Sequence, residues 1–274
     1  MKGLNITIGG LALGLLMSVG SAASGAGFAG TLAASAVGQG AYGSLKGRLV
    51  WGGDTIPPIA TLIEKGKADK DPDVCARDTP IKSRQLVVDP NTKGVAYGFA
   101  YILRPKGSNP AAVEALVKKT PKVEIDQKNC EFLPYVVALH REQTLVFKSS
   151  DAASHNVRFT GFNNTGINTT LAPGGKYEMK NLAAERLPMK LVCDIHPWMQ
   201  GWIMVFDHPF FATTGPDGSF EITGIPAGTQ NLVVWQETVG YTTSGGGRGM
   251  AVTIKAGQTT DVGEIKLDPA KVKK

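Results

Sequence analysis

Short runs of apolar and β-branched residues recur from residue 44 to the end of the chain, with Gly, Pro, Asn and Asp between them. Such runs, separated by turn residues, are typical of the strands of a β-sandwich, whereas βαβ units would alternate strands with longer helical segments. One segment, 111–119, has the pattern of a short helix, and the polar segment 165–170 predicts a loop. The pattern therefore predicts an all-β fold with strands at 45–51, 95–103, 132–139, 144–148, 156–160, 189–193, 202–206, 220–222, 232–235, 251–254 and 262–267.

A boundary is predicted near residue 207, where the sequence reads Asp-His-Pro. Beyond it, Pro216-Asp217-Gly218 stands between two expected strands, and these residue types favour a tight turn. The segment 207–274 is near the lower size limit of an independent domain, so we expect it to pack on the larger region 43–206.

The first residues have the pattern of a secretory signal peptide: Lys2, an apolar run at 6–19, and small residues up to Ala23. We predict a signal peptide over 1–23 and a flexible Gly/Ala linker over 24–42. The alternative is an uncleaved anchor, for which the apolar run is short. No later segment is apolar enough to cross a bilayer, so we expect no membrane insertion after cleavage and a periplasmic or extracellular location, where disulfides persist.

Composition narrows the possible chemistry. The 274 residues carry a formal net charge of +6 but only three cysteines and four histidines. These numbers exclude a dense disulfide scaffold and a zinc site of four cysteines. Lys and Arg are spread along the chain except in the tail 266–274, which argues against a nucleic-acid-binding patch with interleaved aromatic residues. Three cysteines leave one sulfur unpaired, and the sequence alone allows any of the three pairings of Cys75, Cys130 and Cys193.

The candidate chemistry lies in segment 193–199, Cys-Asp-Ile-His-Pro-Trp-Met, which spaces Cys193, His196 and Met199 as C-x2-H-x2-M. A further histidine, His155, stands at the start of a predicted strand. One thiolate, two imidazoles and one thioether form the ligand set of a blue copper site. Each residue also has a plainer interpretation: a hydrogen-bonded histidine, a core methionine or a disulfide cysteine. One cysteine and two histidines also accept zinc. His140 and His208 have no partner at ligand spacing.

These segments resemble the cupredoxins with the short, amicyanin-like ligand loop. A wider resemblance, over roughly residues 43–240, is to exported cupredoxin-like proteins with a carboxypeptidase-regulatory-like end, a planctomycete-type group often called methylamine utilisation proteins. The segments that carry this resemblance are 46–50, 73–75, 86–89, 126–134, 185–188, 193–199 and the Asp-Gly-x-Phe pattern of 217–228.

The resemblance implies a Greek-key cupredoxin-like β-sandwich over 43–206, followed by a small transthyretin-like β-sandwich module over 207–274. It implies one type 1 copper ion held by His155, Cys193, His196 and Met199. It also implies a disulfide between Cys75 and Cys130, which leaves Cys193 free.

Three positions depart from that group. Tyr135 and Gln236 stand where the group usually has histidines, and Ser149 stands where an asparagine often braces the copper thiolate. Because such hydrogen-bonding neighbours tune a metal, these departures give no reduction potential for this chain.

The functional expectation is an exported electron carrier rather than an enzyme, with transient redox partner proteins. Its electrons are expected to pass through His196 near the surface, with Pro197 and Trp198 forming an apolar patch around an exposed edge of that ring. The alternatives are a copper-binding or storage module and a structural cell-surface β-sandwich protein.

Overall fold

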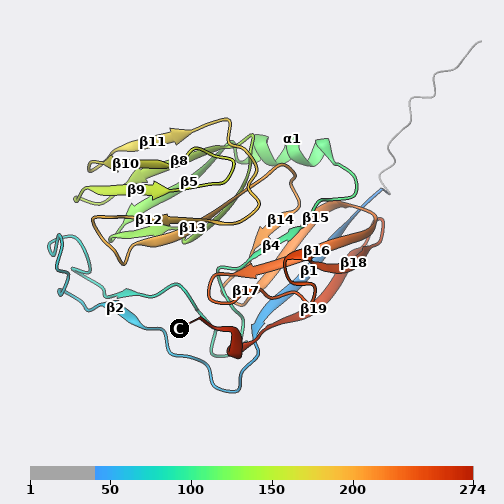
Figure 1. Ribbon diagram of the computed structural model, residues 1–274, viewed down its shortest axis with the longest axis horizontal. Helices are drawn as coiled ribbons and strands as arrows, with labels where there is room; N and C mark the ends of the chain where they lie inside the picture. The colour runs from blue at the N-terminus through green and yellow to red at the C-terminus, as the bar shows by residue number, and fades with distance from the viewer. Residues whose placement is uncertain (1–40, 274) are drawn as a thin grey trace, which may run out of the picture. The chain divides into compact units, whose positions relative to one another are not determined.

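Strands make up most of the regular structure in residues 41–273, the part of the chain that the computed structural model describes. The predicted signal peptide lies outside the described residues, as does the predicted linker except for Ala41 and Tyr42, and Tyr42 begins the first strand. The elements (Figure 1) are β1 (Tyr42–Trp51), β2 (Thr61–Ile63), β3 (Ile81–Lys82), β4 (Phe99–Ile102), α1 (Pro110–Lys119), β5 (Lys122–Lys128), β6 (Glu131–Leu133), β7 (Val136–His140), β8 (Thr144–Ser149), β9 (His155–Phe159), β10 (Ile167–Leu171), β11 (Lys176–Met179), β12 (Met189–Val192), β13 (Gln200–Phe206), β14 (Phe211–Thr213), β15 (Ser219–Pro226), β16 (Gly228–Gln236), β17 (Gly240–Tyr241), the 3-10 turn η1 (Gly246–Arg248), β18 (Met250–Ile254), β19 (Thr259–Leu267) and the 3-10 turn η2 (Pro269–Lys271).

Two sheets from the middle of the chain share one core. The five-stranded sheet has the order β10-β9-β12-β13-β7, and the four-stranded sheet has the order β11-β8-β5-β6. Ile125 and Phe147 of the smaller sheet are buried together with Val157 and Leu191 of the larger one. This pair of sheets carries the candidate metal ligands.

Strands from both ends of the chain form the remaining large sheets. One has the order β15-β1-β19, and the other has the order β14-β4-β16-β17, with β18 also paired to β16. Figure 1 shows β1, near the start of the chain, beside β19, near its end, and the two are paired in parallel. Because β1 and β4 pair with strands that follow residue 210, the strand pairing does not follow the boundary predicted near residue 207.

A third core joins the two sets of sheets. In β13, Ile203 and Val205 point into the core of the first set, whereas Met204 and Phe206 contact Tyr101 of β4 and its neighbours. Successive side chains of a strand point to opposite faces, so such a strand is buried on both sides. This double burial explains why residues 202–206 read as an unbroken apolar run.

The helix agrees with its sequence pattern, whereas one predicted strand and one predicted loop differ from the structure. Asn109 caps α1 by accepting a hydrogen bond from the backbone of Ala112, 3.1 Å away, and Pro110 occupies the first turn, where it needs no donor. The predicted strand 132–139 is divided into β6 and β7 at Pro134, which cannot donate a ladder hydrogen bond. The predicted loop 165–170 contains most of β10, an edge strand whose exposed Asn and Thr side chains hide its alternation.

Residues 52–98 connect β1 to β4 with little regular structure beyond the short strands β2 and β3. A disulfide between Cys75 and Cys130 attaches this connection to the turn between β5 and β6. The connection thereby reaches the end of the first sandwich where the candidate ligands lie. Within residues 41–273, no helix is both long and apolar enough to cross a membrane.

Candidate metal centre

The loop 193–199 is short because the strands on either side of it pair up to their ends. Val192 of β12 is opposite Gln200 of β13, so only seven residues connect the two strands. The loop is closed by two hydrogen bonds, from the backbone N–H of Cys193 to the carbonyl of Met199 (3.1 Å) and from that of Met199 to the carbonyl of His196 (2.9 Å). The loop therefore holds three of the predicted ligands in one turn of chain.

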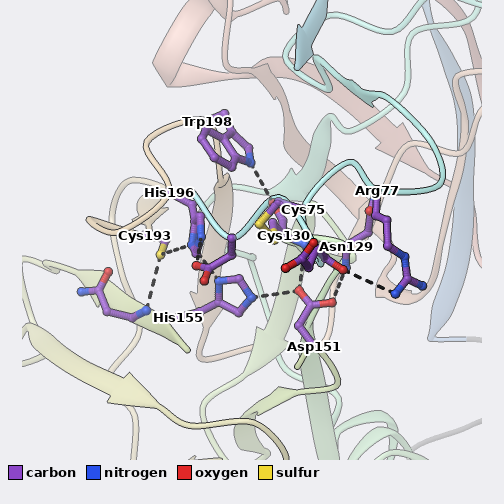
Figure 2. Close-up of a disulfide and its surroundings, with 12 residues drawn as sticks. Cys75, Arg77, Asn129, Cys130, Asp151, His155, Cys193, His196 and Trp198 are labelled. Carbon is purple, nitrogen blue, oxygen red and sulfur yellow. Dashed lines mark hydrogen bonds and ion pairs between the residues drawn. A yellow bond between two sulfur atoms is a disulfide. The ribbon is translucent and has the colours of Figure 1, made fainter. Parts of the chain in front are cut away.

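The fourth predicted ligand, His155, begins β9, the other neighbour of β12 in the sheet. Its Nδ1 lies 3.0 Å from Nδ1 of His196, and Sγ of Cys193 lies 3.8 Å from the same His196 nitrogen. Figure 2 shows the three side chains turned toward one another. The donor atoms of His155, Cys193 and His196 all lie within 4.8 Å of each other.

These separations suit a single metal ion. Metal–nitrogen bonds of about 2.0–2.1 Å and metal–sulfur bonds of about 2.3 Å are usual for imidazole and thiolate ligands. One ion can bind two atoms only if their separation does not exceed the sum of the two metal–ligand bond lengths. The 3.0 Å between the two nitrogens and the 3.8 Å between nitrogen and sulfur are both shorter than the corresponding sums. The donor set, a thiolate with two imidazoles, is also the one that copper accepts in electron-transfer sites.

All four predicted ligands are buried. His155 and His196 have no exposed surface, Cys193 is 2% exposed and Met199 is 1% exposed. Met199 packs in the same core as Cys193, directly before β13. The structure thus brings the histidines and the cysteine together and places Met199 in the same loop beside them.

Each imidazole is held from behind by a carboxylate. Nε2 of His155 lies 2.8 Å from Oδ2 of Asp151, and Nε2 of His196 lies 2.9 Å from Oδ2 of Asp71. Figure 2 shows Asp151 on the opposite side of His155 from Cys193. Because a carboxylate only accepts hydrogen bonds, both Nε2 atoms carry protons, and both Nδ1 atoms face the candidate metal position.

The electrostatics of the cluster favour a thiolate beside an imidazolium when no metal is bound. Burial by itself lowers the pKa of His155, but the hydrogen bonds with Asp151 and Cys193 outweigh it and raise that pKa to about 9. Burial by itself raises the pKa of Cys193, yet hydrogen bonds with the two histidines and with the backbone N–H groups of Asn156 and His196 lower it to about 6. The thiol is therefore prepared for metal binding, which requires the thiolate.

Asn156 connects the ligand loop to the neighbouring strands. Its backbone N–H donates to Sγ of Cys193 (3.4 Å), and its side-chain amide donates to Oδ1 of Asn168 (2.6 Å). Its side-chain oxygen accepts from the backbone N–H of Asp194. At the position of the missing asparagine brace, Ser149 is buried and its hydroxyl has no partner among the described residues. The side chain of Ser149 therefore supplies no hydrogen bond to the thiolate.

The prediction that an edge of the His196 ring is exposed is wrong. The ring is fully buried because the connection 52–98 covers it, with Asp71 on its Nε2. Trp198 lies against His196 with ring centroids 5.2 Å apart, and its indole N–H donates to the carbonyl of Cys130 (3.2 Å). Trp198 thus packs against the disulfide region instead of surrounding an exposed histidine edge.

The remaining cysteines and histidines lie as follows. Cys75 and Cys130 form the disulfide that the resemblance implies, and Cys193 is the free cysteine of the described chain. His140 and His208 lie outside the ligand cluster and serve as hydrogen-bond acceptors, from the backbone N–H groups of Glu142 and Phe210 respectively.

At the other departures from the resembled group, the chain builds an acid–aromatic cluster. Tyr135 donates from its hydroxyl to Glu237, and Trp202 donates from its indole to the same carboxylate (2.7 Å). Burial raises the pKa of Glu237 more than these two hydrogen bonds lower it. Gln236 is buried and donates to the carbonyl of Gln85. These residues connect the two sets of sheets.

Sequence reasoning missed Asp71 and Asp151. Asp151 had a weak signal, since it precedes His155 by four residues in a short turn between two strands. Asp71 had none, because it lies 125 residues from His196 in a connection without regular structure.

No protein-family model matches the chain, and no curated protein matches it significantly. Solved structures with partial similarity include a copper-containing nitrite reductase from Thermus scotoductus SA-01 (21% identity, 31% of this chain and 22% of that chain, TM-score 0.29). They also include a purple cupredoxin from Nitrosopumilus maritimus (20% identity, 31% and 99% of the two chains, TM-score 0.26) and the Cu(I) form of an amicyanin mutant (18% identity, 39% and 98%, TM-score 0.29). This chain therefore spans about a fifth of the nitrite reductase. At this level of similarity the matches assign no family.

Proposed function

We propose that the chain binds one copper ion through His155, Cys193, His196 and Met199 and carries single electrons. The observation that supports this proposal is the convergence of two imidazole nitrogens and one sulfur within 4.8 Å. When bound, copper supplies a one-electron change between Cu(II) and Cu(I), and a site that mixes soft sulfur with imidazole accepts both states.

The protein's own residues would keep such a site rigid and dry. The hydrogen bonds within loop 193–199 fix the spacing of its three ligands. The buried positions of all four ligands exclude water. A fixed arrangement limits the rearrangement that accompanies a change of charge, which favours electron transfer.

The space beside one candidate ligand, Met199, is small. The cavity lined by Met199 and Trp198 has a volume of about 90 Å³. Pockets that bind organic substrates usually measure about 300–1,000 Å³. The space beside Met199 is therefore too small for an organic substrate.

The cellular setting belongs to the same proposal. Disulfides persist in oxidising compartments, so the Cys75–Cys130 bond favours an exported protein. Redox partner proteins of such a carrier would bind through small, transient interfaces. The C-terminal strands would serve as a structural module of the transthyretin-like kind.

A copper-storage role is the second candidate, and the covered His196 favours it. Asp71 and its loop separate this ring from solvent, which slows electron exchange with any partner. A storage protein would bind Cu(I) tightly and exchange electrons slowly, whereas a carrier would exchange electrons rapidly.

The first experiment adds Cu(II) to the purified protein and records the visible spectrum of the wild type, Cys193→Ser and His208→Asn. The proposal expects an intense thiolate-to-copper band in the wild type and in His208→Asn, and its loss in Cys193→Ser. Absence of the band, or its survival in Cys193→Ser, contradicts a copper–thiolate site. Stopped-flow reduction by small donors then separates the candidates, since rapid reduction supports the carrier and slow reduction supports storage.

A further inference from the structure

The two candidate histidine ligands share one arrangement, a carboxylate on the ring nitrogen that faces away from Cys193. Each ring donates its Nε2–H to an aspartate, His155 to Asp151 at 2.8 Å and His196 to Asp71 at 2.9 Å. We propose that Asp71 and Asp151 are positioning residues of the metal site, which fix the ring nitrogen that faces the ion and stabilise its higher oxidation state. This inference rests on the proposed copper function.

The first part of the inference is geometric. A neutral imidazole has two tautomers, and the partner of one nitrogen decides which nitrogen is free to bind a metal. With a carboxylate on each Nε2, the free lone pairs are those on the two Nδ1 atoms, which lie 3.0 Å apart beside Cys193. Without the carboxylates, each ring could rotate or change tautomer.

The second part is electrostatic. A carboxylate bonded to a ligand histidine raises the basicity of the ring. Two such negative charges interact more strongly with Cu(II) than with Cu(I), because the attraction scales with the charge of the ion. The Asp151 side chain is 7% exposed and that of Asp71 is 44% exposed, so solvent screens Asp71 more. Asp151 should therefore have the larger effect.

The disulfide connects the two aspartates. The backbone N–H of Cys75 donates to the carbonyl of Asp71, and that of Cys130 donates to Oδ2 of Asp151, both at 2.8 Å. The backbone N–H of Asn129 adds a third bond, to Oδ1 of Asp151 (2.6 Å). Cys75 is thus bonded to Asp71, the partner of His196, and Cys130 is bonded to Asp151, the partner of His155. Figure 2 shows the second of these two connections.

The test compares Asp71→Asn and Asp151→Asn with Asp73→Asn. Asp73 is a matched control because it is an exposed aspartate of the same loop, two residues from Asp71, and its side chain makes no hydrogen bond within the described chain. Mediated redox titration of the copper-loaded proteins measures the ratio of Cu(II) affinity to Cu(I) affinity. We expect this ratio to fall about tenfold in Asp151→Asn, which a one-electron couple registers as a potential about 59 mV higher. The same change should be smaller in Asp71→Asn and absent in Asp73→Asn.

A second measurement needs no copper. Nitrogen-15 NMR of the metal-free protein reports which ring nitrogen of His196 carries the proton. We expect Nε2–H in the wild type and in Asp73→Asn, and a mixture of tautomers in Asp71→Ala. Because Asp71 lies on an exposed loop, Asp71→Ala still tests the positioning role if Asp151→Asn fails to fold.

The outcomes separate the two proposals. If the wild type gives the thiolate-to-copper band but Asp71→Asn and Asp151→Asn keep the potential of Asp73→Asn, the electrostatic inference is overturned and the copper function stands. An unchanged His196 tautomer in Asp71→Ala overturns the positioning role. If the wild type lacks the band, the copper function fails, and the NMR result still decides whether Asp71 orients His196.

Discussion

Metal uptake by this protein should depend steeply on pH, because in the metal-free protein a proton on His155 lies where the metal would bind. Nδ1 of His155 and Nδ1 of His196 lie 3.0 Å apart, and two bare lone pairs at that distance would repel each other. The metal-free protein avoids this by keeping a proton on His155, whose pKa is raised to about 9 mainly because Asp151 and Cys193 outweigh the effect of burial. Cys193, with a pKa lowered to about 6, is already a thiolate above that pH.

The magnitude follows from these two pKa values. Between pH 6 and pH 9, binding of a metal displaces one proton, from His155, so the apparent affinity should rise about tenfold per pH unit. Over that range the gain is about a thousandfold, or about 4 kcal/mol at 1.36 kcal/mol per unit. Below pH 6 the Cys193 thiol must also lose its proton, and the slope should approach a hundredfold per unit. Above pH 9 the affinity should level off.

Competition with a chelator of known affinity measures this dependence, with Zn²⁺ as a redox-silent probe at four pH values from 6 to 9. Calorimetry in two buffers of different ionisation enthalpy gives the number of protons released, expected to be close to one at pH 7.5. His208→Asn serves as the control and should leave the slope unchanged. An affinity that does not vary between pH 6 and 9, or uptake without proton release, would refute the shared proton.

Three further predictions concern the free energy of unfolding of the metal-free protein, measured by urea titration. The double variant Cys75→Ser, Cys130→Ser should lose about 4 kcal/mol, because the disulfide closes a loop with a sequence separation of 55, and a loss below about 1 kcal/mol would contradict this. Glu185→Ala should lose about 3 to 5 kcal/mol, since the buried carboxylate accepts four hydrogen bonds from residues 162–164, and Glu185→Gln should lose less. Burial lowers the pKa of His208 to about 4, so as the pH falls the unfolded chain binds a proton at His208 before the folded protein does. The free energy of unfolding should therefore fall by about 2 to 3 kcal/mol as the pH drops from 6.5 to 4. His208→Asn should flatten that part of the pH profile.

The ligand loop was the most predictable part of the site. The spacing of Cys193, His196 and Met199 brings three donor types together within seven residues, and a loop between two paired strands has few ways to separate them. His155 was predictable only in combination with that loop, because its neighbours in the chain carry no metal-binding pattern. Local spacing therefore sufficed for the three donor atoms of the loop, but not for His155.

The surroundings of the site could not be predicted, because they depend on contacts between distant segments. Asp71 contacts His196 across 125 residues, and no periodic pattern indicates where an irregular connection will lie. The same limit applies to β1 and β4. Their apolar runs predicted strands, but the choice of β15, β16 and β19 as partners depends on how well competing strands pack. The polar strand β5 was missed because four of its seven side chains are charged.

The burial of His196 bears on which of the two proposed copper functions fits the structure. All four candidate ligands are at most 2% exposed, so an ion could leave only through local opening of loop 193–199 or of the Asp71 segment. The disulfide resists the second opening, because it holds the Asp71 segment to Cys130 and, through it, to Asp151. A protein that delivers copper must release it readily, and this arrangement opposes release. Retention favours a resident ion, as a carrier or a store requires, and the rate of electron exchange then distinguishes these two roles.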